Sequence, residues 1–114
     1  MADNTQELIY AAVRAAEDKK ARDLVVLDLT DISPVCDYFL ICSGNSSTQV
    51  QAIAENIKDK LREKGVDFLR IEGMKDAHWI LMDYGTFVVH IFQEEDRDFY
   101  NLEHLWADAK VVDF

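Results

Sequence analysis

The side chains that could do chemistry are spaced in a way that matches no common arrangement of ligands or nucleophiles. The cysteines and histidines are Cys36, Cys42, His78, His90 and His104. Zinc sites typically place two cysteines or two histidines within a few residues of each other, and no such pair occurs here. Cys42 lies inside the apolar run YFLIC, where burial disfavours the thiolate that a nucleophile needs. The spacing therefore predicts no metal site, no cofactor and no catalytic residue.

The segment SGNSST, residues 43–48, is the best candidate for binding a phosphate. It falls between an expected strand and an expected helix, where backbone N–H groups and the helix dipole attract anions. An ordinary strand-to-helix turn needs the same residue types, however, and the segment lacks a Walker lysine and a complete GxGxxG motif. Nucleotidyl transfer would also need paired carboxylates, whereas Asp28 and Asp31 are three residues apart and separated by a strand end. A nucleotide-binding or nucleotidyl-transferring enzyme that uses this segment is the alternative function.

Hydrophobic periodicity predicts the elements that position these residues. Apolar residues recur at helical spacing over residues 5–18, after a capping-box pattern at Asn4 and Glu7, and again over 50–61, after a serine cap. The other expected elements are strands at 23–29, 38–43 and 67–71, a hairpin at 78–83 and 86–92, an acidic turn EEDRD, and a short helix at 99–106. The pattern predicts an α+β fold in a single domain, residues 1–114, with a mixed sheet of about five strands and packed helices. Residues 107–114 are expected to be a frayed tail.

The expected hairpin has two different faces. If Tyr84 and Gly85 form a two-residue loop, Trp79 pairs with His90. Because alternate side chains of a strand point to opposite faces, one face is wholly apolar and predicted to be core: Ile80, Met82, Phe87, Val89 and Ile91. The other face consists of Trp79, Leu81, Asp83, Val88, His90 and Phe92. This mixture of aromatics with a histidine and a carboxylate is typical of an interface centre, so His90 is interpreted as part of a binding surface.

The charge of the chain indicates the kind of partner. Its net charge is −10, which makes free nucleic acid an unfavourable ligand. Residues 72–114 contain 10 acidic residues against Lys75, Arg97 and Lys110, so a charged partner is expected to be basic and to bind this part of the chain. No apolar run approaches the roughly 20 residues that span a bilayer, and the start does not resemble a signal peptide. We therefore expect a cytoplasmic protein with reduced cysteines and no membrane contact.

Three segments carry a resemblance to a known family: DYFLICSGNSSTQVQAIAENI, IEG followed by HWILMDYGTFVVHIF, and RDFYNLEHLW. In this order and spacing they closely resemble the ribosomal silencing factor family, also called the Iojap-like or RsfS family, over residues 6–106. The resemblance implies a nucleotidyltransferase-like fold that lacks the catalytic carboxylates and is not an enzyme. It also implies a translation repressor that binds the large ribosomal subunit through its fourteenth large-subunit protein. Such a factor blocks joining of the small subunit when nutrients are scarce.

The charge and the hairpin face together predict where this partner binds. A protein this acidic is expected to contact a basic ribosomal protein instead of ribosomal RNA. The predicted protein-binding residues are Glu72, Trp79, Leu81, Asp83, His90, Phe92, Glu94, Glu95, Tyr100 and Glu103. Trp79 and Tyr100 would be anchors, and Asp83 and the glutamates would pair with lysine or arginine. A homodimer formed through the same face is a further alternative.

Overall fold

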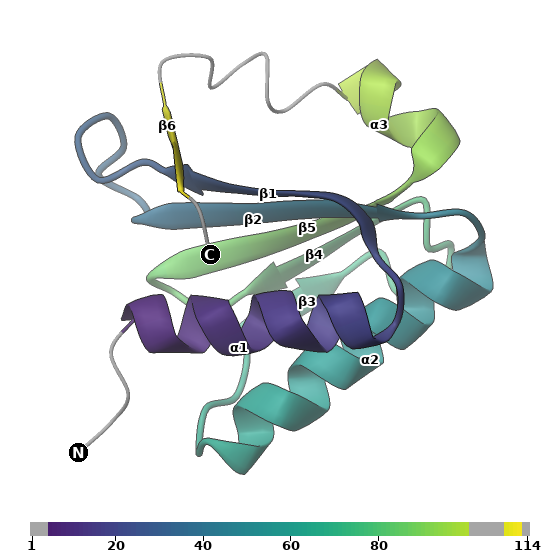
Figure 1. Cartoon of the computed structure of the whole chain (residues 1–114), viewed down its shortest axis with the longest axis horizontal. Helices are drawn as coiled ribbons and strands as arrows, with labels where there is room; N and C mark the ends of the chain where they lie inside the picture. Colours follow the sequence, from purple (N-terminus) through teal and green to yellow (C-terminus); the bar gives the residue numbers. More distant parts are fainter. Residues whose placement is uncertain (1–4, 101–108, 113–114) are drawn as a thin grey trace.

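Figure 1 shows the computed structural model, which describes residues 5–100 and 109–112. The predicted α+β fold is confirmed, with six strands in one mixed sheet in the order β3-β4-β5-β2-β1-β6. The helices are α1 (Thr5–Asp18), α2 (Ser47–Glu63) and α3 (Glu94–Tyr100), and the strands are β1 (Arg22–Asp28), β2 (Tyr38–Gly44), β3 (Arg70–Glu72), β4 (Trp79–Asp83), β5 (Phe87–Gln93) and β6 (Lys110–Val112). β2 and β5 are parallel, and the other neighbouring strands are antiparallel. Within the described ranges, no helix has the length and apolar character needed to cross a membrane.

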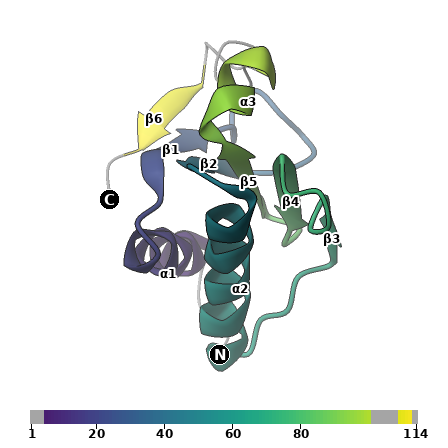
Figure 2. The same ribbon diagram turned by 90° about the vertical axis from the view of Figure 1, so that its right-hand side faces the viewer.

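The main core lies between one face of the sheet and two helices. α1 and α2 both cover this face, and α3 lies on the opposite side of the sheet (Figures 1 and 2). α1 has the predicted bounds, and Ser46 caps α2 by accepting a hydrogen bond from the Gln49 N–H at 3.1 Å. The predicted core face of the hairpin is confirmed, because all five of its side chains are fully buried: Ile80, Met82, Phe87, Val89 and Ile91. The face of the hairpin that could meet a partner is therefore the opposite one.

The pairing of the hairpin strands differs from the prediction. Trp79 pairs with Phe92, and Leu81 pairs with His90, so the predicted pair of Trp79 and His90 is wrong. The shift is two residues, an even number, and alternation in a strand has a period of two. Every side chain therefore keeps its predicted face.

The loop explains the shifted pairing. The Tyr84 N–H donates to the Phe87 carbonyl at 3.0 Å, which leaves Gly85 and Thr86 as the two loop residues. Gly85 has φ 89°, and Asp83 Oδ1 accepts a hydrogen bond from its N–H at 2.8 Å. The usual two-residue hairpin loops need positive φ at their first residue. A loop that began at Tyr84 would place that strain on a bulky residue, whereas this loop begins at the glycine.

The C-terminal segments also differ from the prediction. The acidic residues expected in a turn form the first part of α3, which begins at Glu94. Residues 110–112, expected in a frayed tail, form β6 and pair with residues 26–28 of β1. The outer edge of β1 offers backbone N–H and C=O groups that need partners, and the β-branched Val111 and Val112 suit a strand there. The expected helix at 99–106 falls mostly outside the described residues.

Candidate functional site

The face of the sheet opposite α1 and α2 contains a small second core. Phe92 is fully buried and His90 is 4% exposed, so the interpretation of these two as surface residues was wrong. Trp79, which is half-buried, stacks on Phe92 with ring centroids 5.3 Å apart, and its Nε1–H donates to His90 Nδ1 at 3.0 Å. The Phe39 ring packs edge-on against the imidazole at 4.5 Å. His90 and Phe92 therefore support this face from beneath instead of contacting a partner.

The imidazole of His90 is neutral in this setting. Because Nδ1 accepts the hydrogen bond from Trp79, the ring proton lies on Nε2. Burial lowers the pKa of His90 from 6.5 to about 4. Nε2 is itself buried and has no hydrogen-bond partner among the described residues, so protonation of the ring would add a charge that nothing nearby compensates.

A hollow on this face remains open beside Leu81. Its volume is about 300 Å³, and its wall is mainly apolar: Ser33, Val35, Cys36, Phe39, Arg70, Leu81, Asp83, Val88 and His90. Val35 at its rim is 84% exposed. The hollow and Val35 together form an apolar surface that another protein could cover. The sequence placed Leu81, Asp83 and Val88 on this face. It did not place Val35, because this residue lies in the loop between β1 and β2, where no periodicity predicts which way a side chain points.

The acidic residues of this face are partly neutralised by one arginine. Glu72 and Asp83 were predicted to bind a basic partner, and they lie on either side of Arg70. Arg70 Nε is 3.4 Å from a Glu72 oxygen and 3.9 Å from an Asp83 oxygen. Both acids are thus on the predicted face, but they share a cation that sequence reasoning did not include. The pairing of β3 with β4 brings Arg70 opposite Asp83.

The two adjacent glutamates after β5 point to different places. Glu94 forms an ion pair with Arg22 of β1 at 3.1 Å, whereas Glu95 lies near His78, which directly precedes Trp79. Only Glu95 is therefore close to the Trp79 end of the hairpin face. The side chain of Tyr100, and Glu103 as a whole, lie outside the described residues. We use the term docking face below for Glu72, Trp79, Leu81, Asp83 and Glu95 together with the hollow.

Comparison with known proteins identifies the family. Residues 2–114 match the family model described as "Ribosomal silencing factor during starvation".

The chain belongs to the ribosomal silencing factor family.

Relatives of this silencing factor are found in bacteria and in plants. It is 48% identical over 110 residues to the Bacillus subtilis protein named ribosomal silencing factor RsfS, covering 96% of this chain and 93% of the other. It is 33% identical over 115 residues to the chloroplastic Iojap protein of Zea mays, covering 98% of this chain and 50% of the maize protein. A crystal structure of a Bacillus halodurans protein, 46% identical, superposes with a TM-score of 0.86 and covers 96% of this chain and all of the other. Family membership makes the chain a silencing factor and not an enzyme.

The silencing factor does not assemble the residues that the alternative enzyme would need. Arg22 of β1 pairs with Ser43 of β2, and Asp28 pairs with Tyr38 at the other end of the same strands. The two pairs are six positions apart along β1 and five along β2, a distance of roughly 17 to 20 Å. Asp28 instead accepts hydrogen bonds from the Thr30 N–H and hydroxyl, which lower its pKa. Asp28 is therefore remote from the SGNSST segment, and Asp31 follows it in the turn beyond the strand.

The SGNSST segment serves the fold. Ser46 caps α2, and Gln49 Oε1 accepts a hydrogen bond from the Asn45 N–H at 2.6 Å. The Gln49 amide also donates to the carbonyls of Lys19 and Lys20, which fastens the turn to the end of α1. Two backbone N–H groups that could have bound a phosphate are thus already satisfied within the protein.

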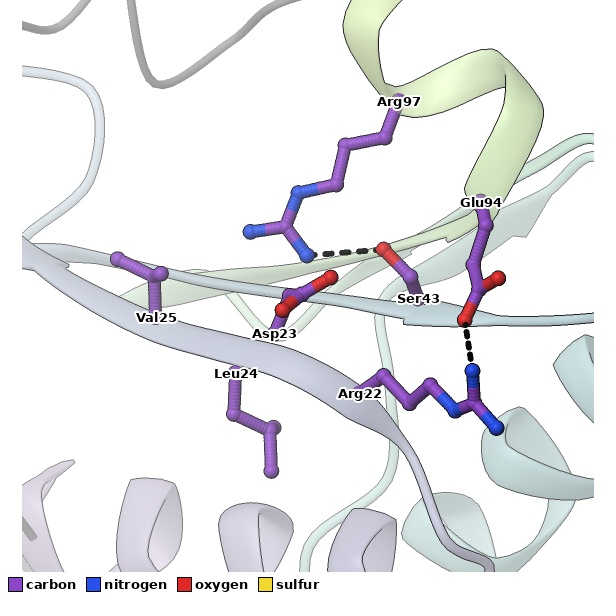
Figure 3. Close-up of a pocket in the computed structure, with 7 residues that line it drawn as sticks. All are labelled: Arg22, Asp23, Leu24, Val25, Ser43, Glu94 and Arg97. Atoms are coloured by element: carbon purple, nitrogen blue, oxygen red, sulfur yellow. Dashed lines mark hydrogen bonds and ion pairs between the residues drawn. The ribbon is translucent and has the colours of Figure 1, made fainter.

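Beside this segment lies a polar hollow of about 800 Å³ between β1, β2 and α3 (Figure 3). Its two cations are both engaged: Arg97 donates to the Ser43 hydroxyl at 2.8 Å, and Arg22 pairs with Glu94. Asp23 and Glu94 balance the two arginines, so this hollow has no excess positive charge for a phosphate. It supports neither nucleotide binding nor transfer.

Two further predictions concerned the Cys42 nucleophile and a metal site. Burial raises the pKa of the Cys42 thiol to about 12, which disfavours the thiolate that a nucleophile needs. The prediction of no metal site rested on spacing along the chain. Folding brings His78 of the loop before β4 close to Glu95 and Asp96 of α3, an arrangement that spacing could not show.

Proposed function

We propose that this protein binds the large ribosomal subunit through its fourteenth large-subunit protein and sterically blocks joining of the small subunit. Repression of translation under nutrient limitation would then result from occlusion, without any chemical step. Family membership supports the ribosome as the target, and a chain with net charge −10 favours a basic ribosomal protein over RNA as the direct contact.

The docking face is the observation that carries this proposal. It combines an open apolar hollow with acidic side chains nearby, on the side of the sheet that α1 and α2 leave free. Leu81 lines the hollow from the middle of β4, with Glu72 opposite it on β3. An apolar centre with a charged rim is the usual composition of a protein interface. A lysine- or arginine-rich partner would bury an apolar side chain in the hollow and pair with the acids.

The test is co-sedimentation with isolated large subunits, using Leu81→Arg. We expect this variant to bind about tenfold more weakly or worse, because it puts a cation and a longer side chain into the hollow that a basic partner must enter. Leu81 is half-buried at the surface, so an arginine can extend into solvent and the fold should persist. Circular dichroism and thermal unfolding check this.

The matched control is Tyr10→Arg, which adds the same charge at a 46% exposed side chain of α1, on the other side of the sheet. It should bind like the parent. Equal binding by Leu81→Arg and the parent would refute the docking face. Binding of the parent that persists unchanged when small subunits are added would refute the occlusion. Sizing of the parent and of Leu81→Arg over a range of concentrations tests whether a second copy uses the same face.

Replacement of Arg70 should accelerate association with the large subunit. Arg70→Gln frees Glu72 and Asp83 to attract a basic partner. We expect about a threefold higher association rate at low salt, which corresponds to the free energy of one exposed ion pair. The gain should shrink as salt screens the charges. Stopped-flow association at several salt concentrations measures it.

The control for net charge is Arg62→Gln, which removes the same charge from an ion pair with Asp67 at 2.7 Å near the end of α2. If Arg62→Gln accelerates association as much as Arg70→Gln, the effect comes from the overall charge of the protein and not from Glu72 and Asp83 on the docking face.

A further inference from the structure

Three potential metal ligands meet where the loop before β4 contacts the start of α3. His78 Nδ1 is 2.7 Å from Asp96 Oδ2, and one ligand atom each from His78, Glu95 and Asp96 lies within 4.8 Å of the other two. An imidazole nitrogen with two carboxylate oxygens is a donor set that divalent transition metals such as Zn²⁺ and Mn²⁺ accept. Small side-chain rotations would bring all three atoms to bonding distance of one ion.

The backbone holds the two sides of this cluster together. The Gln93 N–H donates to the His78 carbonyl at 3.0 Å, and the Gln93 side-chain amide donates to the Ala77 carbonyl at 3.1 Å. Ala77 is fully buried, and its N–H donates to the Gly73 carbonyl at 2.9 Å. Because Gln93 directly precedes α3, these bonds hold His78 beside the first turn of that helix. Ligands that are already positioned lose little conformational entropy on binding.

The arginines nearest to the cluster have other partners. The neighbouring Glu94 pairs with Arg22, and Arg97 donates to Ser43. In the described part of the chain, neither Glu95 nor Asp96 pairs with a lysine or arginine. The two carboxylates belong to a protein of net charge −10, which attracts cations. A divalent cation would balance part of this charge.

We propose that His78, Glu95 and Asp96 bind one divalent transition-metal ion, with water completing its coordination. The ion would replace the hydrogen bond between His78 and Asp96 and would tie α3 to the start of β4, next to the docking face. This site does not depend on ribosome binding, since all three ligands come from one chain.

The test is calorimetric titration of tag-free protein with Zn²⁺, with the visible absorption of Co²⁺ as a report on the ligands. We expect saturable binding of one ion per chain by the parent. His78→Gln and Glu95→Gln should each weaken it by about tenfold or more, because each removes a ligand. Both side chains are exposed, so the fold should be retained. The matched control is Glu94→Gln, which removes an equal charge one residue away and should keep the affinity of the parent.

Three results would overturn the site. The first is a parent protein with no saturable binding, which would leave only a surface hydrogen bond between His78 and Asp96. The second is His78→Gln that binds as tightly as the parent, which would place the ion elsewhere. The third is equal weakening by Glu94→Gln and Glu95→Gln, which would indicate diffuse attraction of cations to acidic residues.

Discussion

Lowering the pH from 6.5 to 4 is expected to remove about 3 kcal/mol from the free energy of unfolding through His90 alone. The folded protein holds this pKa at about 4, whereas the imidazole of the unfolded chain has the ordinary value of 6.5. Between these values the unfolded state binds a proton that the folded state excludes. The contribution is therefore fully present above pH 6.5 and is lost as the pH falls toward 4. For a small domain this is a large part of the total stability.

Urea unfolding at a series of pH values measures this effect, with His90→Gln as the comparison. The glutamine side-chain oxygen can still accept the hydrogen bond from Trp79, but the side chain cannot be protonated. We expect a much flatter dependence on pH between 6.5 and 4, whatever the stability of the variant at neutral pH. Both proteins keep the same carboxylates, including Asp28, whose lowered pKa contributes only at more acidic pH. Parallel curves for the two proteins would contradict a buried, neutral His90.

The largest expected loss from a single small substitution is at Gly73. Its φ is 84°, and a Cβ there would overlap the carbonyl oxygen of Trp79. A positive φ costs an alanine about 1 kcal/mol, and displacement of packed backbone adds to that, so Gly73→Ala should lose about 3 kcal/mol or more. The displaced strand is the start of β4, so the docking face should be disturbed too.

Gly65 provides a matched control for this substitution. Its φ of 82° is nearly the same, but a Cβ there meets nothing within 4 Å. Gly65→Ala should therefore cost only the backbone strain of about 1 kcal/mol. Chemical unfolding of both variants separates strain from overlap. Equal losses at the two positions would show that the contact with Trp79 relaxes without cost.

Local patterns were sufficient to predict the elements of the main core. The bounds of α1, the serine cap of α2 and the core face of the hairpin all follow from periodicity and capping, which depend on neighbours in sequence. The bend of the hairpin was predicted one residue too early, because the pattern allows Gly85 at either loop position. With Gly85 in the second position, Tyr84 would need a strained positive φ. The alternation of the strands was unaffected.

Contacts between distant segments decided the parts that were predicted wrongly. β6 forms because β1 offers an unpaired edge, which nothing in residues 107–114 reveals. The cluster of His78, Glu95 and Asp96 likewise depends on hydrogen bonds between the loop before β4 and the end of β5.

The sequence by itself determined the family of this protein, its charge, and which side of the hairpin faces away from the main core. Only the tertiary structure decided which side chains on that side remain accessible. Alternation in a strand sets the direction of a side chain, but its burial depends on what packs above it. Trp79 and Phe39 cover His90, so that the histidine belongs to a second core, while Leu81 and Val35 remain beside an open hollow.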